Sequence, residues 1–207
     1  GAAVGKRTTA WMLVVALGDA GHRVPLFGTG LTAWLQGARY SLIMDAIVND
    51  FVTGEIEHAT WKAWQETGAD ALVIEGQGSL MNPAYPGGFE ILAAARPDAI
   101  VLQHPPQRRE YDGLPGYALH PLDMQITALE LVSQRPVVAV TVSGEGMDER
   151  QSFEACARIT RETGLVAVNP VLDGLEPVGE TLRPFLPGGS EWMQSRAGKK
   201  RSNASTA

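Results

Sequence analysis

The sequence contains a single cysteine, Cys156, so the chain cannot form an internal disulfide. This cysteine falls in a segment whose pattern predicts a helix, and we interpret it as a buried structural thiol rather than a nucleophile. The chain also lacks any apolar run long enough to cross a bilayer, which predicts no membrane partner. We therefore expect a cytoplasmic protein.

Positive charge is scarce as well. The chain has 17 Lys and Arg against 23 Asp and Glu, a net charge of −6, whereas a general nucleic-acid-binding protein presents a basic face. The one concentrated basic run, at residues 199–201, lies in a Gly/Ser/Asn-rich stretch, and we predict that residues 188–207 form a disordered basic tail. The remaining 1–187, in a chain that is 44% hydrophobic, suffice for one globular domain with its own core.

The first nine residues have the layout of a phosphate-binding loop. Small residues lead into Gly5-Lys6, and an apolar, helix-forming segment follows over residues 10–20. Small residues let backbone N–H groups approach an anion, the helix start adds the positive end of its dipole, and the lysine adds a charge. A Gly-Lys pair at a helix start also arises by accident, so the motif alone leaves its function open. The predicted phosphate-binding residues are Val4, Gly5, Lys6, Arg7, Thr8 and Thr9.

This loop departs from the common pattern G-x-x-x-x-G-K-[ST], in which a hydroxyl directly after the lysine holds Mg²⁺. Arg7 occupies that position, and Thr8 and Thr9 follow it. The leading glycine and the strand expected before it would lie upstream of residue 1. We therefore expect the sheet of this chain to lack its first strand.

The rest of the chain alternates short apolar strands with helices. Strands are predicted at 23–27, 70–75, 98–103, 136–142 and 165–168, and helices at 45–66, 89–95, 122–133 and 147–163. Strands that are apolar throughout indicate a parallel sheet covered on both faces. We predict an α/β fold, a P-loop NTPase-like three-layer α/β/α arrangement with a mostly parallel sheet.

Polar and glycine residues directly follow four of these strands, at 28–30, 75–79, 103–104 and 141–144. In an open parallel sheet, ligands bind outside the carboxyl ends of the strands. Glu75 is a candidate to hold Mg²⁺ or to act as a base, or it merely caps the neighbouring loop. His104 is the histidine best placed for proton transfer, although a structural histidine bonded to backbone explains it nearly as well. Arg108 is a candidate clamp for a carboxylate or phosphate, or a solvated loop residue.

Several motifs in order along residues 1 to about 185 resemble one family. They are Val-Gly-Lys-Arg-Thr-Thr (4–9), Ala-Ile-Val-Asn-Asp-Phe-Val (46–52), Ile-Glu-Gly-Gln-Gly-Ser-Leu (74–80), Asn-Pro-Ala-Tyr (82–85) and Asp-Gly-Leu-Pro-Gly-Tyr (112–117). The chain is similar to the C-terminal P-loop domain of the D-glutamate N-acetyltransferase family, which is related in fold to dethiobiotin synthetase. The resemblance implies an upstream Rossmann-like domain that this chain does not include.

The resemblance also implies acetyl transfer from acetyl-CoA to the amine of D-glutamate or a similar amino acid. On that hypothesis the loop holds the coenzyme's phosphates, and Glu75 or His104 is the base. The substrate-binding residues that we predict are Thr29, Gly76, Gln77, Gly78, Ser79, Tyr85 and Arg108. We expect a small-molecule substrate and a homo-oligomer.

Two alternatives to acetyl transfer stay open. One is an ATP–Mg²⁺-dependent phosphotransferase or ligase acting on a small carboxylic or amino acid, with Thr8 and Glu75 as the metal-binding residues. Arg7 in the place of the hydroxyl weakens that hypothesis. The other is a non-catalytic nucleotide-binding domain, whose loop binds a phosphate for stability.

Overall fold

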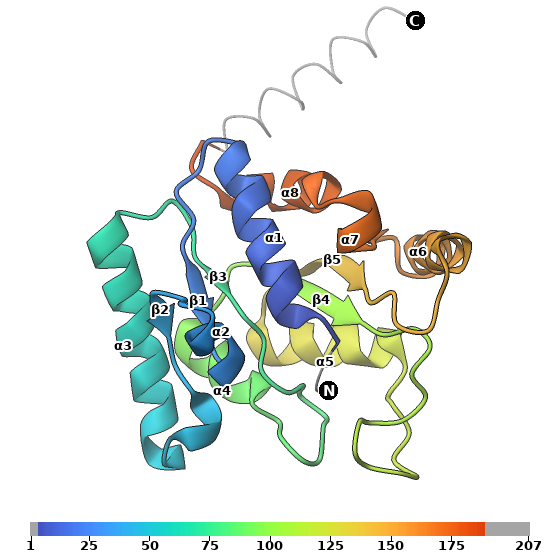
Figure 1. Ribbon diagram of the computed structural model, residues 1–207, viewed down its shortest axis with the longest axis horizontal. Helices are drawn as coiled ribbons and strands as arrows, with labels where there is room; N and C mark the ends of the chain where they lie inside the picture. Colours follow the sequence, from blue (N-terminus) through green and yellow to red (C-terminus); the bar gives the residue numbers. More distant parts are fainter. Residues whose placement is uncertain (1–3, 189–207) are drawn as a thin grey trace, which may run out of the picture.

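The computed structural model of the chain describes residues 4–188 (Figure 1). Residues 1–3 of the predicted loop and residues 189–207 of the predicted tail lie outside the described residues. Within the described part, no helix combines the length and apolar character that a membrane span needs.

Helices and strands alternate along the chain as the sequence predicts, with additional short elements. The first half contains α1 (Lys6–Asp19), β1 (Leu26–Gly28), α2 (Leu31–Leu35), β2 (Tyr40–Ser41), the 3-10 helix η1 (Met44–Ala46), α3 (Asn49–Thr67), β3 (Val73–Ile74) and α4 (Gly88–Ala95). The second half contains β4 (Ile100–His104), α5 (Leu122–Ser133), β5 (Val137–Val142), α6 (Glu149–Thr163), β6 (Val166–Val168), α7 (Pro170–Asp173), α8 (Glu176–Leu182) and η2 (Arg183–Phe185). The helix predicted from residue 45 begins only at Asn49, because η1 and an extended turn precede it.

The α/β fold with parallel strands is confirmed, but the strands form two sheets rather than one. The first sheet has the order β2-β1-β3 and the second has the order β4-β5-β6, and every neighbouring pair is parallel. Among the described residues β3 and β4 do not pair with each other.

Helix α1 joins the two sheets. It contacts β1 and β3 of the first sheet, and its Leu13 and Leu17 pack in one cluster with Ala139 of β5 and Val168 of β6. In Figure 1 this helix crosses the front of the molecule between β3 and β4. Helices α3 and α6 pack on the first and second sheets through separate clusters around Ile56 and Ile159. Helices thus cover the sheets in layers, as predicted.

A cavity of about 550 Å³ lies beneath α1 and between the two sheets. Residues 71–74 around β3 line one side and residues 99–103 around β4 line the other, with apolar side chains of α1 and α4 between them. The facing backbone edges of β3 and β4 therefore border an apolar space rather than a neighbouring strand. Val4 and Lys6, at the start of α1, line the same cavity.

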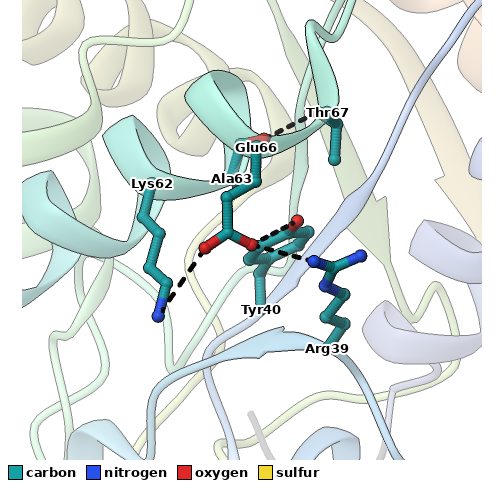
Figure 2. Close-up of polar contacts among 6 residues, drawn as sticks. All are labelled: Arg39, Tyr40, Lys62, Ala63, Glu66 and Thr67. Atoms are coloured by element: carbon teal, nitrogen blue, oxygen red, sulfur yellow. Dashed lines mark hydrogen bonds and ion pairs between the residues drawn. The ribbon is translucent and has the colours of Figure 1, made fainter.

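The β2 edge of the first sheet is connected to the last turn of α3 through the carboxylate of Glu66 (Figure 2). Glu66 accepts hydrogen bonds from the Tyr40 hydroxyl at 3.1 Å and from Arg39 at 3.0 Å, and Lys62 lies 3.9 Å away. The Arg39 guanidinium also lies over the Tyr40 ring. Because β2 is only two residues long, these side-chain contacts supplement a short backbone ladder in holding the edge.

The interpretation of Cys156 as a buried thiol is confirmed. The residue lies on α6 against Val140 and Val142 of β5, and burial raises the pKa of its thiol to about 11. A thiol with so high a pKa is protonated at neutral pH, and the thiolate is the reactive form. Cys156 is therefore a poor candidate for a catalytic nucleophile.

Candidate functional site

The backbone of the predicted phosphate loop has the conformation that an anion cradle requires. Gly5, which precedes the first turn of α1, has φ 88° and ψ 11°, in the left-handed region that favours glycine. The Thr9 amide donates to the Gly5 carbonyl at 2.9 Å, which begins the helix. Among residues 4–188 no side chain caps this helix start, and its first turn contains no acidic residue, an arrangement that suits the approach of an anion.

Lys6 turns from the start of α1 into the cavity. Burial lowers the pKa of its amine, while the nearby Glu75 carboxylate opposes that shift and Arg108 adds to it. A Cβ on residue 76 would stand 3.4 Å from Cδ of Lys6, so the glycine at this position leaves room for the lysine side chain. The Lys6 amine is therefore close enough to the Glu75 carboxylate and to the Arg108 guanidinium for both charges to act on it.

Glu75 directly follows β3, and its side chain is 8% exposed. Its amide donates to the Phe27 carbonyl at 2.9 Å, which continues the pairing of β3 with β1 and fixes the direction of the residue. The Thr29 amide approaches its Oε2 at 3.4 Å, and the Thr29 hydroxyl donates to its backbone carbonyl at 3.0 Å. Burial raises the pKa of Glu75, opposed in turn by the Thr29 amide, Arg7 and Lys6.

The loop after Glu75 is held in a tight turn. Gly78 has φ 61°, and a Cβ there would stand 2.0 Å from the Tyr85 carbonyl oxygen, so no other residue fits. The Ser79 amide reaches the same carbonyl at 3.4 Å. The side-chain amide of Gln77 donates a hydrogen bond to the Asp45 carboxylate at 3.0 Å, which connects this loop to η1, between β2 and α3. Tyr85 thus contributes its backbone to the turn, and its ring packs against the α3 cluster.

Arg108, on the loop after β4, lines the same cavity as Lys6. Its side chain is 17% exposed, and it forms an ion pair with Glu145 of the loop after β5 at 2.8 Å. Its charge also acts on Lys6. The structure therefore brings one predicted substrate-binding residue to the lysine, and the pairing with Glu145 orients its guanidinium.

The other residues of the loop differ in placement. Arg7 is near enough to Glu75 for its charge to oppose the raised pKa of that carboxyl. Thr8 is exposed, whereas Thr9 is buried beneath the loop. Among residues 4–188, no three His, Cys, Asp or Glu side chains gather in a metal-binding cluster. The metal-binding roles of Thr8 and Glu75 therefore stay predictions, which depend on phosphate oxygens completing the coordination.

His104 lies on the other face of its sheet from the loop. Its neighbour Gln103 bonds to residues on the α1 side, and successive side chains of a strand point to opposite faces. In the register of the sheet His104 is paired with Val142, whose side chain packs toward α6. Burial, with the nearby charge of Arg158 on α6, lowers the pKa of His104 to about 4. The structure does not bring this histidine to Glu75 and Lys6.

Two polar residues beneath the loop were not predicted as site residues. Gln103 and the fully buried Thr141 lie opposite each other on β4 and β5; Gln103 accepts one hydrogen bond from Thr9 in the first turn of α1 and another from Thr141. Both stand at strand ends, which was the available sequence signal. The face to which each points depends on strand pairing, which a single sequence does not give.

The site as a whole combines an uncapped helix start with cations and one desolvated carboxylate. Such a cradle suits a phosphate-bearing group, because amide N–H groups and a lysine meet it without a competing acid in the helix turn. A buried carboxylate with a raised pKa at the end of the neighbouring strand suits proton transfer. Lys6 lines the cavity, and the charge of the Glu75 carboxylate acts on it.

Comparisons with known proteins identify the family of this chain. A family model described as a domain of unknown function (DUF1611_C), P-loop domain, matches residues 1–179. A D-glutamate N-acetyltransferase from Pseudoalteromonas sp is 30% identical over 185 residues, covering 84% of this chain and 53% of that protein. A protein of the same name from Tritonibacter scottomollicae is 29% identical over 178 residues, covering 83% of this chain and 52% of that protein.

A solved structure shares the fold. The crystal structure of a DUF1611 family protein from Anabaena variabilis ATCC 29413 superposes with a TM-score of 0.81 at 28% identity, covering 87% of this chain and 54% of that one. This chain therefore spans about half the length of the curated relatives it matches. With its phosphate-type loop, its parallel strands and this family match, the chain belongs to the DUF1611 family and contains its P-loop domain.

Proposed function

We propose that this chain is the P-loop part of a small-molecule transferase, which moves an acetyl group from acetyl-CoA to the amine of D-glutamate or a similar amino acid. The observation that carries the proposal is that Lys6 and Arg108 line one cavity, while the buried Glu75 carboxylate at the end of β3 is near enough for its charge to act on Lys6. The names of the curated relatives supply the acyl group and the acceptor class. The chain spans about half of those proteins, so the activity is proposed for the protein that contains this domain.

The residues of the loop fit a phosphate-bearing acyl donor. The left-handed Gly5 and the start of α1, which no side chain of the described residues caps, suit the binding of phosphates, and Lys6 and Arg108 supply positive charge. Acetyl-CoA supplies the acetyl group as a thioester. The acceptor ammonium must lose a proton before it attacks, and a general base needs a pKa near the working pH.

Glu75 is our candidate for that base. Burial raises the pKa of its carboxyl, which makes its ionised form a stronger base than a solvated carboxylate. The Gly76–Ser79 turn lies directly beside it, and the backbone amides of that turn are candidate donors to the substrate or to the developing oxyanion. His104, on the other face of the sheet, is the less suitable of the two predicted bases.

The alternative with ATP and Mg²⁺ also draws on one feature of the site. A buried carboxylate at a strand end near a loop lysine is a position from which P-loop enzymes hold the metal. Arg7 in place of the metal-binding hydroxyl weighs against it, and Thr8, the next hydroxyl, is exposed.

Calorimetry on the longer protein that contains this domain separates the two. We expect acetyl-CoA to bind without any metal, and ATP to bind weakly whether or not Mg²⁺ is present. Tight, Mg²⁺-dependent binding of ATP with no heat from acetyl-CoA would overturn the acetyl-transfer proposal. A chromatographic assay for N-acetyl-D-glutamate, with L-glutamate as the matched acceptor, then tests the acceptor.

A further inference from the structure

We propose that Gln103 is a positioning residue that holds the phosphate loop in its anion-binding conformation. The inference rests on the anion-binding part of the proposed function and is independent of which group is transferred. It concerns a residue of β4 that lies beneath the loop and lines the cavity.

The side-chain oxygen of Gln103 accepts two hydrogen bonds at once. The Thr9 hydroxyl donates to Oε1 at 2.7 Å, and the Thr141 hydroxyl donates to the same atom at 2.7 Å. Thr141 is fully buried and Thr9 is 8% exposed, so neither hydroxyl can be satisfied by bulk water. One amide thus connects β4 to the first turn of α1, 94 residues away in sequence, and to β5, 38 residues away.

With the oxygen engaged in this way, the amide nitrogen of Gln103 points toward the loop. Nε2 lies 3.8 Å from the point where a Cβ on residue 5 would stand. This is the left-handed glycine that turns the loop into α1. Gln103 therefore places neutral N–H donors beside the glycine of the loop.

A glutamine suits this position better than a carboxylate or an apolar residue. A carboxylate would accept the same two hydroxyls, but it would place a negative charge beneath an anion and would offer no donor to the loop. An apolar residue would leave two buried hydroxyls without an acceptor, which destabilises the fold. Replacement by glutamate should therefore weaken anion binding while the fold is retained, whereas replacement by an apolar residue should destabilise the fold itself.

The experiment measures binding of inorganic pyrophosphate by calorimetry at pH 8 for the wild type, Gln103→Glu and Gln103→Leu. We expect Gln103→Glu to keep its Tm within a few degrees while its Kd rises about tenfold or more, a difference of about 1.4 kcal/mol. In acetyl-transfer assays its KM for acetyl-CoA should rise more than its kcat falls. Gln103→Leu should show both a lower Tm and weaker binding of pyrophosphate. The matched control is Gln65→Glu, the same change at an exposed position on α3.

A second pair of variants keeps the test decisive if either Gln103 variant fails to fold. Thr141→Ser retains the hydroxyl and Thr141→Val removes it, and we expect only the valine variant to bind pyrophosphate more weakly. Wild-type pyrophosphate affinity in Gln103→Glu or in Thr141→Val would overturn the inference, as would a wild-type protein that binds no pyrophosphate. A protein that binds pyrophosphate through Gln103 but transfers no acetyl group would refute the proposed function alone.

Discussion

Lys6 and Glu75 show how burial shapes the chemistry of single residues in this protein. Burial lowers the pKa of the lysine and raises the pKa of the glutamate, and in each case the partner's charge opposes the shift. Desolvation therefore outweighs the attraction between them. A bound anion would add negative charge beside Lys6 and favour its protonated form, which links ligand binding to the protonation of the pair.

Lys6→Ala tests the loop directly. The variant removes the ammonium group of the loop lysine, and we expect kcat/KM for the acyl donor to fall by about 100-fold or more. Its unfolding temperature should be unchanged or higher, because a desolvated charge is removed. Lys62→Ala, at an exposed position on α3, is the matched control. Full turnover by Lys6→Ala would show that the loop is structural and would favour the non-catalytic alternative.

Glu75 should give the protein a characteristic pH dependence. Because its pKa is raised in the folded state, the folded protein holds the proton more tightly, and the stability from this group is lost as pH rises through the folded pKa. Activity should rise over the same pH range as the base ionises. We expect Glu75→Gln to lose both effects, its stability relative to wild type improving as pH increases. Urea unfolding and kcat/KM profiles from pH 4 to 8 measure this, and a variant with the wild-type rate would remove Glu75 as the base.

The lowered pKa of His104 predicts the opposite dependence of stability on pH. Its pKa falls to about 4 in the folded protein, so the folded state disfavours the proton and stability is lost as pH falls from about 6.5 toward 4. The full effect is about 3 kcal/mol from this one group. Denaturation of wild type and His104→Gln at pH 7 and pH 4 should show this difference, which the variant lacks. Because the side chain faces away from the loop, kcat/KM at pH 7 should stay within about threefold of wild type; a larger loss would restore His104 as a catalytic candidate.

At the scale of the element, one glycine at the N-cap of α1 and one within the helix have opposite requirements. Gly5 has a positive φ at the helix start, whereas Gly18 lies inside the helix with open space around it. Alanine costs about 1–2 kcal/mol in the left-handed region but gains about 0.5–1 kcal/mol over glycine within a helix. The same substitution should thus act in opposite directions at the two ends of one helix.

We expect Gly5→Ala to lower the free energy of unfolding and to weaken pyrophosphate binding, and Gly18→Ala to raise the free energy of unfolding with binding unchanged. Urea titration and calorimetry on the same samples measure both quantities. A Gly5→Ala protein with wild-type stability and affinity would show that the left-handed turn is not needed for the cradle.

At the scale of the molecule, the separation of the two sheets is the main feature. The Val73 and Glu75 amides of the first sheet donate to carbonyls at Pro25 and Phe27, so the intervening Ile74 amide faces the cavity. A sheet edge that borders an apolar cavity lacks the pairing that backbone groups require. The chain of residues 1–207 should therefore be poorly stable when expressed alone.

Two measurements on that chain check this prediction. In hydrogen exchange, the Ile74 amide should exchange faster than those of Val73 and Glu75, which serve as internal controls on the same strand. Thermal unfolding should occur below the range of about 45–65 °C that is usual for mesophile domains. A cooperative transition inside that range, with Ile74 protected, would contradict the prediction.

Local features of the sequence were enough to predict the loop, the alternation of helices and strands and the parallel pairing. They were also enough to single out Glu75, because a carboxylate directly after an apolar strand marks the ligand-binding edge of a sheet. These features depend on neighbouring residues, whose spacing and backbone preferences act over a few positions. The motifs of the chain also indicated the family that the comparisons support.

Only the tertiary structure decided which strand-end residues meet. Gln103 and His104 are neighbours in sequence, yet pairing of β4 with β5 sends one beneath the loop and the other toward α6. The approach of Lys6 to Glu75, and the division of the strands into two sheets, likewise depend on contacts between distant segments. A side chain's face follows from strand register, and register is set by the packing of the whole molecule rather than by any one stretch of the chain.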